Sequence, residues 1–142
     1  MMLALSRVFL VPALVLCLFG PAARAQTDNA VRDVKAAPGK DARVAIYTNI
    51  RPDCTSGPLP SIRLVAPPTH GTVTVKRGTL KATNIKQCLA AEVPVLVAFY
   101  RAAETFNGSD TFDLEINFGG GRKQVQHFQV TVSGGQGGDQ GI

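Results

Sequence analysis

The sequence is poor in the residues that most catalytic and redox sites need. Among its 142 residues there is no tryptophan, and there are two methionines, two histidines and three cysteines. The methionines are Met1 and Met2, so the remaining chain cannot supply the axial methionine of a blue-copper site. Cys-x-x-Cys, H-E-x-x-H, G-x-S-x-G and Walker-type motifs are missing. These absences exclude the commonest signatures of redox, zinc-dependent, hydrolytic and nucleotide-binding enzymes.

The length and composition limit the architecture. A chain of 142 residues has the length of a single domain and is too short for a TIM barrel or a two-domain dehydrogenase. A hydrophobic content of 45% is that of a folded chain rather than a disordered one. Fourteen glycines and nine prolines predict many turns, and no segment shows a convincing helical stripe. A β-rich fold is therefore expected.

The first 25 residues predict a cleaved export signal. Arg7 precedes an apolar run over residues 8–19, and Ala23 and Ala25 are the small residues that a signal peptidase reads. The run is shorter than the roughly 20 residues that a membrane span needs, so no stable membrane insertion is expected after cleavage. Residues 26–133 are then one domain, and the Gly-rich residues 134–142 are a disordered tail. The protein is expected in the periplasm or outside the cell.

Export also predicts a disulfide. Cys17 leaves with the signal, and Cys54 and Cys88 remain as a pair in an oxidising compartment. Their Cα atoms should then lie about 4.4–6.8 Å apart.

The charge balance is mildly basic. The formal net charge of the whole chain is +5, and the signal removes Arg7 and Arg24 but no acid. The remaining bases are scattered along the chain, which does not predict a nucleic-acid partner.

The clearest local pattern is a two-residue alternation near the end of the chain. Apolar residues at 112, 114, 116 and 118 and at 128, 130 and 132 flank a Gly-rich turn over residues 119–123. This predicts a hairpin whose core face holds Phe112, Leu114, Ile116, Phe128, Val130 and Val132. With its turn centred on residues 119–123, the hairpin places position 114 opposite position 128, and Glu115 opposite His127.

Further strands are expected at 43–48, 61–65 and 72–76, with a short one at 78–82 and an edge strand at 31–36. Residues 93–100 are apolar on both faces, which predicts a central strand. Seven or eight short strands without helices indicate an antiparallel β-sandwich.

Two segments resemble the motifs of bacterial immunoglobulin-like and cadherin-like domains. Residues 68–73 (PTHGTV) resemble a "P-x-H-G-x-V" segment, and residues 100–112 resemble "Y-x-P-x-x-x-F-x-G-x-D-x-F", with Ala102 in place of the proline. The resemblance implies an immunoglobulin-like sandwich and small exported relatives of unassigned role. The matching residues that we single out are His70, Gly71, Tyr100, Phe106, Gly108, Asp110 and Phe112.

The chemistry of these motif residues predicts structural roles. Gly71 and Gly108 permit a positive φ or a close backbone approach. Asp110 can accept bonds from backbone amides at the start of its strand, as in an Asx turn. Phe106 is expected in the core, and His70 is expected to bond a nearby backbone group.

The leading hypothesis is an exported, non-enzymatic immunoglobulin-like module that binds an unknown protein or cell-surface polymer, or has a structural role. No metal or cofactor is expected, although weak calcium binding stays open, as does the oligomeric state. The alternative is a small envelope enzyme or enzyme inhibitor acting through a loop. A deep pocket holding His70 or His127 beside a carboxylate would favour the enzyme, and a closed sandwich with shallow hollows would favour the module.

Overall fold

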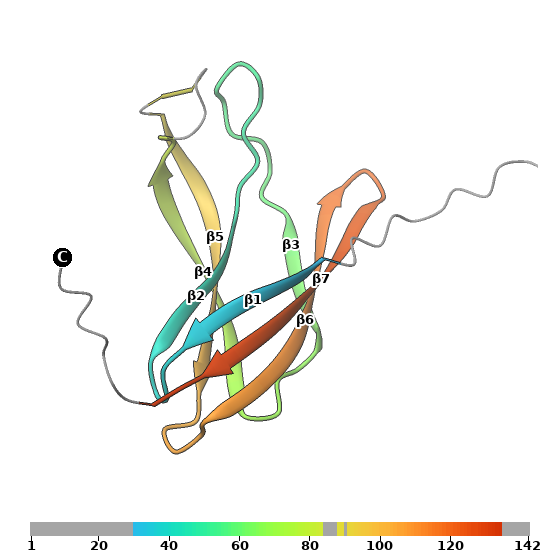
Figure 1. Cartoon of the computed structure of the whole chain (residues 1–142). Helices are drawn as coiled ribbons and strands as arrows, with labels where there is room; N and C mark the ends of the chain where they lie inside the picture. The colour runs from blue at the N-terminus through green and yellow to red at the C-terminus, as the bar shows by residue number, and fades with distance from the viewer. Residues whose placement is uncertain (1–29, 84–87, 90, 135–142) are drawn as a thin grey trace, which may run out of the picture.

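The computed structural model describes residues 30–83, 88–89 and 91–134, and these residues form seven strands in two sheets (Figure 1). One sheet has the order β1 (Val31–Ala36), β7 (Arg122–Val132), β6 (Gly108–Gly119), β3 (Ser61–Ala66). The other has the order β2 (Asp41–Tyr47), β5 (Glu92–Ala102), β4 (Gly71–Lys81). The expected β-sandwich is confirmed. The expected signal and all of the expected tail except Gly134 lie outside the described residues.

The strand pairing is antiparallel except between β1 and β7, which run parallel. Four strands packed on three is the division of an immunoglobulin-like sandwich. The strands expected at 72–76 and 78–82 form a single strand, β4. Gly78 pairs with Val95 within an unbroken register, so this glycine continues the strand rather than turning it.

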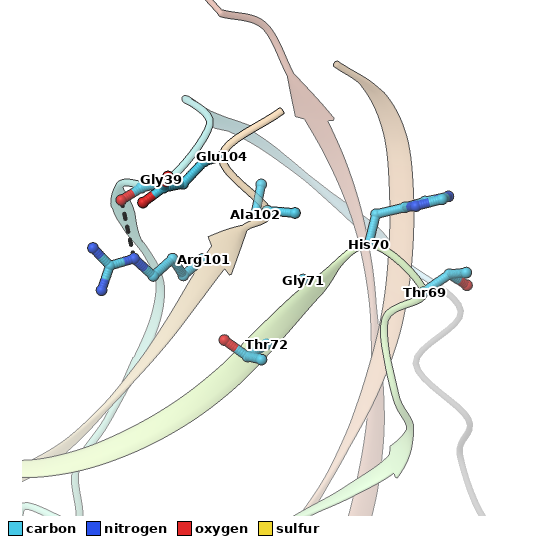
Figure 2. Close-up of a pocket in the computed structure, with 9 residues that line it drawn as sticks. Gly39, Thr69, His70, Gly71, Thr72, Arg101, Ala102 and Glu104 are labelled. Carbon is cyan, nitrogen blue, oxygen red and sulfur yellow. Dashed lines mark hydrogen bonds between the residues drawn. The ribbon is translucent and has the colours of Figure 1, made fainter. Parts of the chain in front are cut away.

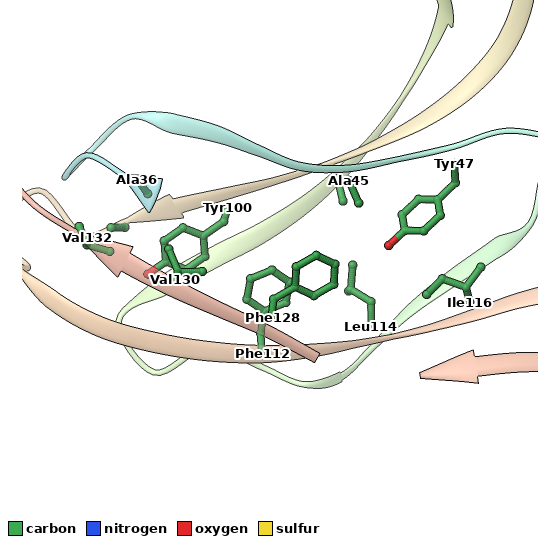
Figure 3. Close-up of a cluster of buried hydrophobic side chains, with 12 residues drawn as sticks. Ala36, Ala45, Tyr47, Tyr100, Phe112, Leu114, Ile116, Phe128, Val130 and Val132 are labelled. Atoms are coloured by element: carbon green, nitrogen blue, oxygen red, sulfur yellow. The ribbon is translucent and has the colours of Figure 1, made fainter. Parts of the chain in front are cut away.

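The main core lies between the sheets, where side chains of β6 and β7 face side chains of β2 and β5 (Figure 3). All six core residues predicted from the alternation are at most 2% exposed. Phe112 stacks between Tyr100 and Phe128, with ring centroids 5.9 and 4.7 Å away. Across the sheets, the Tyr47 hydroxyl donates a 2.8 Å hydrogen bond to Oε1 of the buried Gln126.

Strand β5 is buried on different faces at its two ends, which explains its apolar character on both faces. Ala98 and Tyr100 belong to the main core and are fully buried. Val93 and Val95 are 1% and 2% exposed but lie outside that core. They are an odd number of residues away from Ala98, so their side chains point to the other face of the strand. The start of β5 therefore buries the opposite face of the strand.

The predicted register of the last hairpin is wrong by two residues. Phe112 pairs with Phe128, and Asp113 rather than Glu115 lies opposite His127. A shift of two residues keeps every side chain on its face, so the alternation could not detect it.

The turn fixes the observed register. Gly120 and Gly121 have φ of 61° and 78°, as the two central residues of a type I′ turn require. The register is irregular between Asn117 and Gly119, where one extra residue is accommodated. The hairpin is therefore tighter than the five-residue turn expected from the sequence.

Candidate functional site

The Asp110 carboxylate is the centre of a buried hydrogen-bond network. Its Oδ1 accepts bonds from the backbone N–H groups of Thr69 and Thr111, both at 3.0 Å. Its Oδ2 accepts the N–H of His70 at 2.9 Å and the hydroxyl of Tyr100 at 2.8 Å. The prediction that Asp110 accepts hydrogen bonds from backbone amides is confirmed. Two of these amides, those of Thr69 and His70, lie outside its own strand. We call these five residues the Asp110 network.

The network joins both sheets to a loop. Asp110 belongs to β6 and Tyr100 to β5, in the other sheet, while Thr69 and His70 lie in the connection from β3 to β4. Burial raises the pKa of the Asp110 carboxyl, but the Tyr100 hydroxyl and the three backbone N–H groups outweigh it and lower the pKa overall. Burial and the contact with Asp110 raise the pKa of Tyr100. Asp110 is therefore a charged structural clamp at neutral pH.

The remaining motif residues surround this clamp. The His70 ring, expected to bond a backbone group, stacks on Phe106 with centroids 4.1 Å apart, while the His70 carbonyl accepts the N–H of Ala103. A Cβ on Gly71 would lie 2.6 Å from the Arg101 carbonyl oxygen, so this glycine serves close backbone approach. Gly108 has a φ of 139°, which side chains rarely adopt. The structure thus brings the motif residues together.

A hollow of about 460 Å³ lies beside the network, between β4, the end of β5 and the β1–β2 turn (Figure 2). Arg101 Nε donates a 3.0 Å bond to the Gly39 carbonyl there, and the side chains of Thr69 and His70 point away from Arg101. The polar contact shown in this hollow holds the β1–β2 turn against β5.

His127 does lie beside a carboxylate, but on the outer face of the four-stranded sheet. Its Nδ1 is 2.8 Å from Oδ1 of Asp113, and the two side chains are 36% and 28% exposed. The neighbouring Glu115 pairs with Arg63 at 3.2 Å and with Lys123 at 3.7 Å. These groups form a solvated row of hydrogen bonds and ion pairs rather than the deep pocket that would favour an enzyme.

Within residues 30–83, 88–89 and 91–134, no three side chains of His, Cys, Asp or Glu gather closely enough to hold a metal ion. Over the same part of the chain, no helix has the length and apolar character to cross a bilayer.

The two long sides of the sandwich differ in how they are closed. On one side the chain crosses directly from β1 to β2, and there Gly39 N–H donates to the Ala102 carbonyl, at the end of β5 in the other sheet, at 3.0 Å. We call this the closed side. The other side is bounded by β3 and β4, the last strands of the two sheets. We call it the open side.

Inward-facing aliphatic residues are left uncovered on the open side. Leu64 pairs with the buried Leu114, and Val75 with the buried Ala98, so both share the core face of their sheets. They are nevertheless 38% and 40% exposed. The sequence gives no signal of this, because both residues sit in alternations typical of buried strands.

The disulfide closes the far end of the open side. Cys54 and Cys88 are bonded with Cα atoms 5.3 Å apart, as predicted. Cys54 lies in the connection that leads to β3, and Cys88 in the connection that follows β4. The Asp110 network holds the β3–β4 connection at the other end. The open side is therefore fixed at both ends and uncovered between them.

The fold and these contacts define a disulfide-linked β-sandwich module. Comparison with known proteins adds little to that class. The chain matches no protein-family model and no curated protein. It is similar to a solved structure titled "Solution Structure of Amebosin", with 12% identity, a TM-score of 0.39, and coverage of 71% of this chain and 88% of that chain. So distant a likeness carries no functional conclusion.

Proposed function

We propose that this protein is an exported, non-enzymatic, immunoglobulin-like module of the bacterial cell envelope, in the periplasm or outside the cell, that binds another envelope component through its open side. The observation that carries the proposal is the exposure of Leu64 and Val75 on the core face of the two edge strands. Apolar groups in an inward-facing position gain most from a partner that covers them. The partner is a protein or a cell-surface polymer.

Other features support a binding role rather than catalysis. The buried carboxylate of Asp110 is fully engaged in holding backbone groups and the Tyr100 hydroxyl. The disulfide and the Asp110 network fix the two ends of the open side, which keeps a binding surface in its bound shape and reduces the entropic cost of association. An export signal and a disulfide are consistent with work in an oxidising envelope.

Site-specific photo-crosslinking in the envelope tests the proposal. A photoreactive amino acid would replace Val75 on the open side, and the matched control would replace Val31, an aliphatic residue on β1 that is 55% exposed. We expect discrete adducts from position 75 and none from position 31. Equal labelling from both positions, or no adduct from position 75, contradicts the proposal.

A further inference from the structure

Strand β4 is unusual among the four edge strands of the sandwich. β1 and β3 have six residues each, β2 has seven, and the registers of β2 and β3 are irregular. β4 has eleven residues, a continuous register with β5, and nine residues that are exposed. Short length and bulges are two of the usual protections of an edge against pairing with another strand. β4 has neither.

The free edge of β4 offers backbone groups in a regular row. In an antiparallel pair, alternate residues turn their N–H and C=O groups away from the partner strand. In β4, about five residues therefore point their backbone N–H and C=O groups away from β5, where no strand pairs with them. An extended peptide that adds as a further strand would satisfy them.

The inward face of β4 changes from apolar to basic along its length. Val73 packs on the main core, Val75 is 40% exposed, and Arg77 follows on the same face two residues later. Arg77 lines a hollow of about 570 Å³ with Pro94 and residues 57–61, which lead into β3. The open side thus places an apolar contact next to a guanidinium in a hollow.

The charges of β4 favour an acidic occupant. The strand carries Lys76, Arg77 and Lys81 and no acid. Asp41 lies 3.7 Å from Lys76, and Glu92 is the cross-strand neighbour of Lys81. Arg77 faces Leu96 across the ladder. A guanidinium binds a carboxylate through two parallel hydrogen bonds, which makes Arg77 the natural anchor for an acidic side chain.

The same charges disfavour a second copy of this chain as the occupant. If β4 paired with β4 of another molecule over its full length about a two-fold axis, Lys76, the central residue of Gly71–Lys81, would lie opposite its own copy. Like charges directly opposite each other destabilise an antiparallel pair.

We propose that the occupant of the open side is an extended acidic peptide segment of a partner protein, which adds to β4 as a further strand. One of its aliphatic side chains covers Val75, and an acidic side chain two residues away binds Arg77. This inference rests on the proposed function and names the chemical class of its partner.

Three synthetic peptides of about ten residues test it on the intact protein. The first alternates Thr and Val, with Glu in place of one inward Val. The second has Lys instead of that Glu, and the third keeps the Glu but has a central Pro that blocks strand pairing. We expect the Glu peptide to bind at least about tenfold more tightly than the Lys peptide, and the Pro peptide to lose binding. Amide exchange should slow in β4 and stay unchanged in β1.

A charge swap provides the matched control. Arg77→Glu should reverse the preference so that the Lys peptide binds better, whereas Lys35→Glu, the same charge change on exposed β1, should leave both affinities within about twofold. Equal loss in the two variants, equal binding of the Glu and Lys peptides, or binding without protection of β4 amides would overturn the inference.

Two further outcomes reassign the surface. Self-association that protects β4 without peptide would make a second copy the occupant, and tight binding of an anionic polysaccharide without protection of β4 would make it a polymer. Crosslinks from position 75 to another envelope component, combined with the polysaccharide result, leave the proposed function intact while removing this inference, whereas crosslinks to a second copy of this chain remove both. The two failures are therefore distinguishable.

Discussion

The closed and open sides of this sandwich are held by different means. The closed side is joined by the direct β1–β2 crossing and by backbone bonds such as Gly39 N–H to the Ala102 carbonyl. On the open side the chain also crosses directly, from β3 to β4, and the Asp110 network holds that connection, while the Cys54–Cys88 disulfide fixes the other end. Between them, Leu64 and Val75 remain exposed. The difference shows how a small domain can be stable while an inward-facing surface stays available to a partner.

The largest loss of stability should come from a substitution in the Asp110 network, which holds one end of the open side. Asp110→Ala removes a carboxylate that is 4% exposed and leaves the Tyr100 hydroxyl and partly buried backbone N–H groups without their acceptor. Because four hydrogen bonds to a charged acceptor are lost together, we expect a loss of about 3–5 kcal/mol in the free energy of unfolding, measured by urea denaturation. The control Asp113→Ala, on the exposed face of the same strand, should cost at most about 1 kcal/mol. Similar costs would show that Asp110 is no clamp.

The pH dependence of stability sharpens the same point. Folding lowers the pKa of Asp110 below its ordinary value of 3.8. Its stabilisation is therefore fully present above that value and is lost as the pH falls through the lower folded-state pKa. Urea denaturation from about pH 7 down to about pH 2 should show this acid-induced loss. In Asp110→Asn, which cannot titrate, this component of the loss should disappear; an unchanged profile would assign acid instability to other groups.

The disulfide end should follow. Replacing both Cys54 and Cys88 by Ala removes a cross-link between residues 34 positions apart, so the unfolded chain is no longer held in a closed loop. We expect a loss of about 2–4 kcal/mol, because the cross-link restricts the unfolded ensemble. In hydrogen exchange, the far end of β4 should lose more protection than the closed side. Uniform loss across both sides would mean that the disulfide acts only on global stability.

A smaller effect is expected within the core. Tyr47→Phe removes the hydroxyl that reaches Gln126 from the other sheet and leaves that buried amide oxygen without this donor. The cost should be about 1 kcal/mol, read from the shift in denaturation midpoint at an unchanged m-value. A neutral substitution would show that water replaces the hydroxyl.

The smallest change in stability should come from the open side itself. Val75→Thr adds a hydroxyl at a position that is 40% exposed and should change stability by less than about 0.5 kcal/mol. Val130→Thr, the same substitution at a fully buried position, should cost about 1–3 kcal/mol. The affinity for the Glu peptide should show the opposite pattern: it should weaken in Val75→Thr and change little in Val130→Thr. If Val75→Thr destabilises as strongly as Val130→Thr, the open side is part of the core.

Several features of this protein follow from local sequence alone. A strict two-residue alternation places Phe112, Leu114 and Ile116 on one face, because strand side chains point alternately to opposite faces. Two cysteines that remain after an expected export signal predict the Cys54–Cys88 bond. The motif residues around Asp110 were recognisable as one set, and the bonding of backbone amides by Asp110 follows from the chemistry of a short carboxylate side chain.

Tertiary structure decided the rest. The hairpin register depended on the φ values of Gly120 and Gly121 and on an irregularity after Asn117, neither of which changes which face a side chain occupies. That is why His127 lies beside Asp113 rather than Glu115. Likewise, Leu64 and Val75 belong to alternations like those of core residues. Only the order of strands within the two sheets, set by long-range pairing, puts β3 and β4 at the edges and leaves these two side chains exposed.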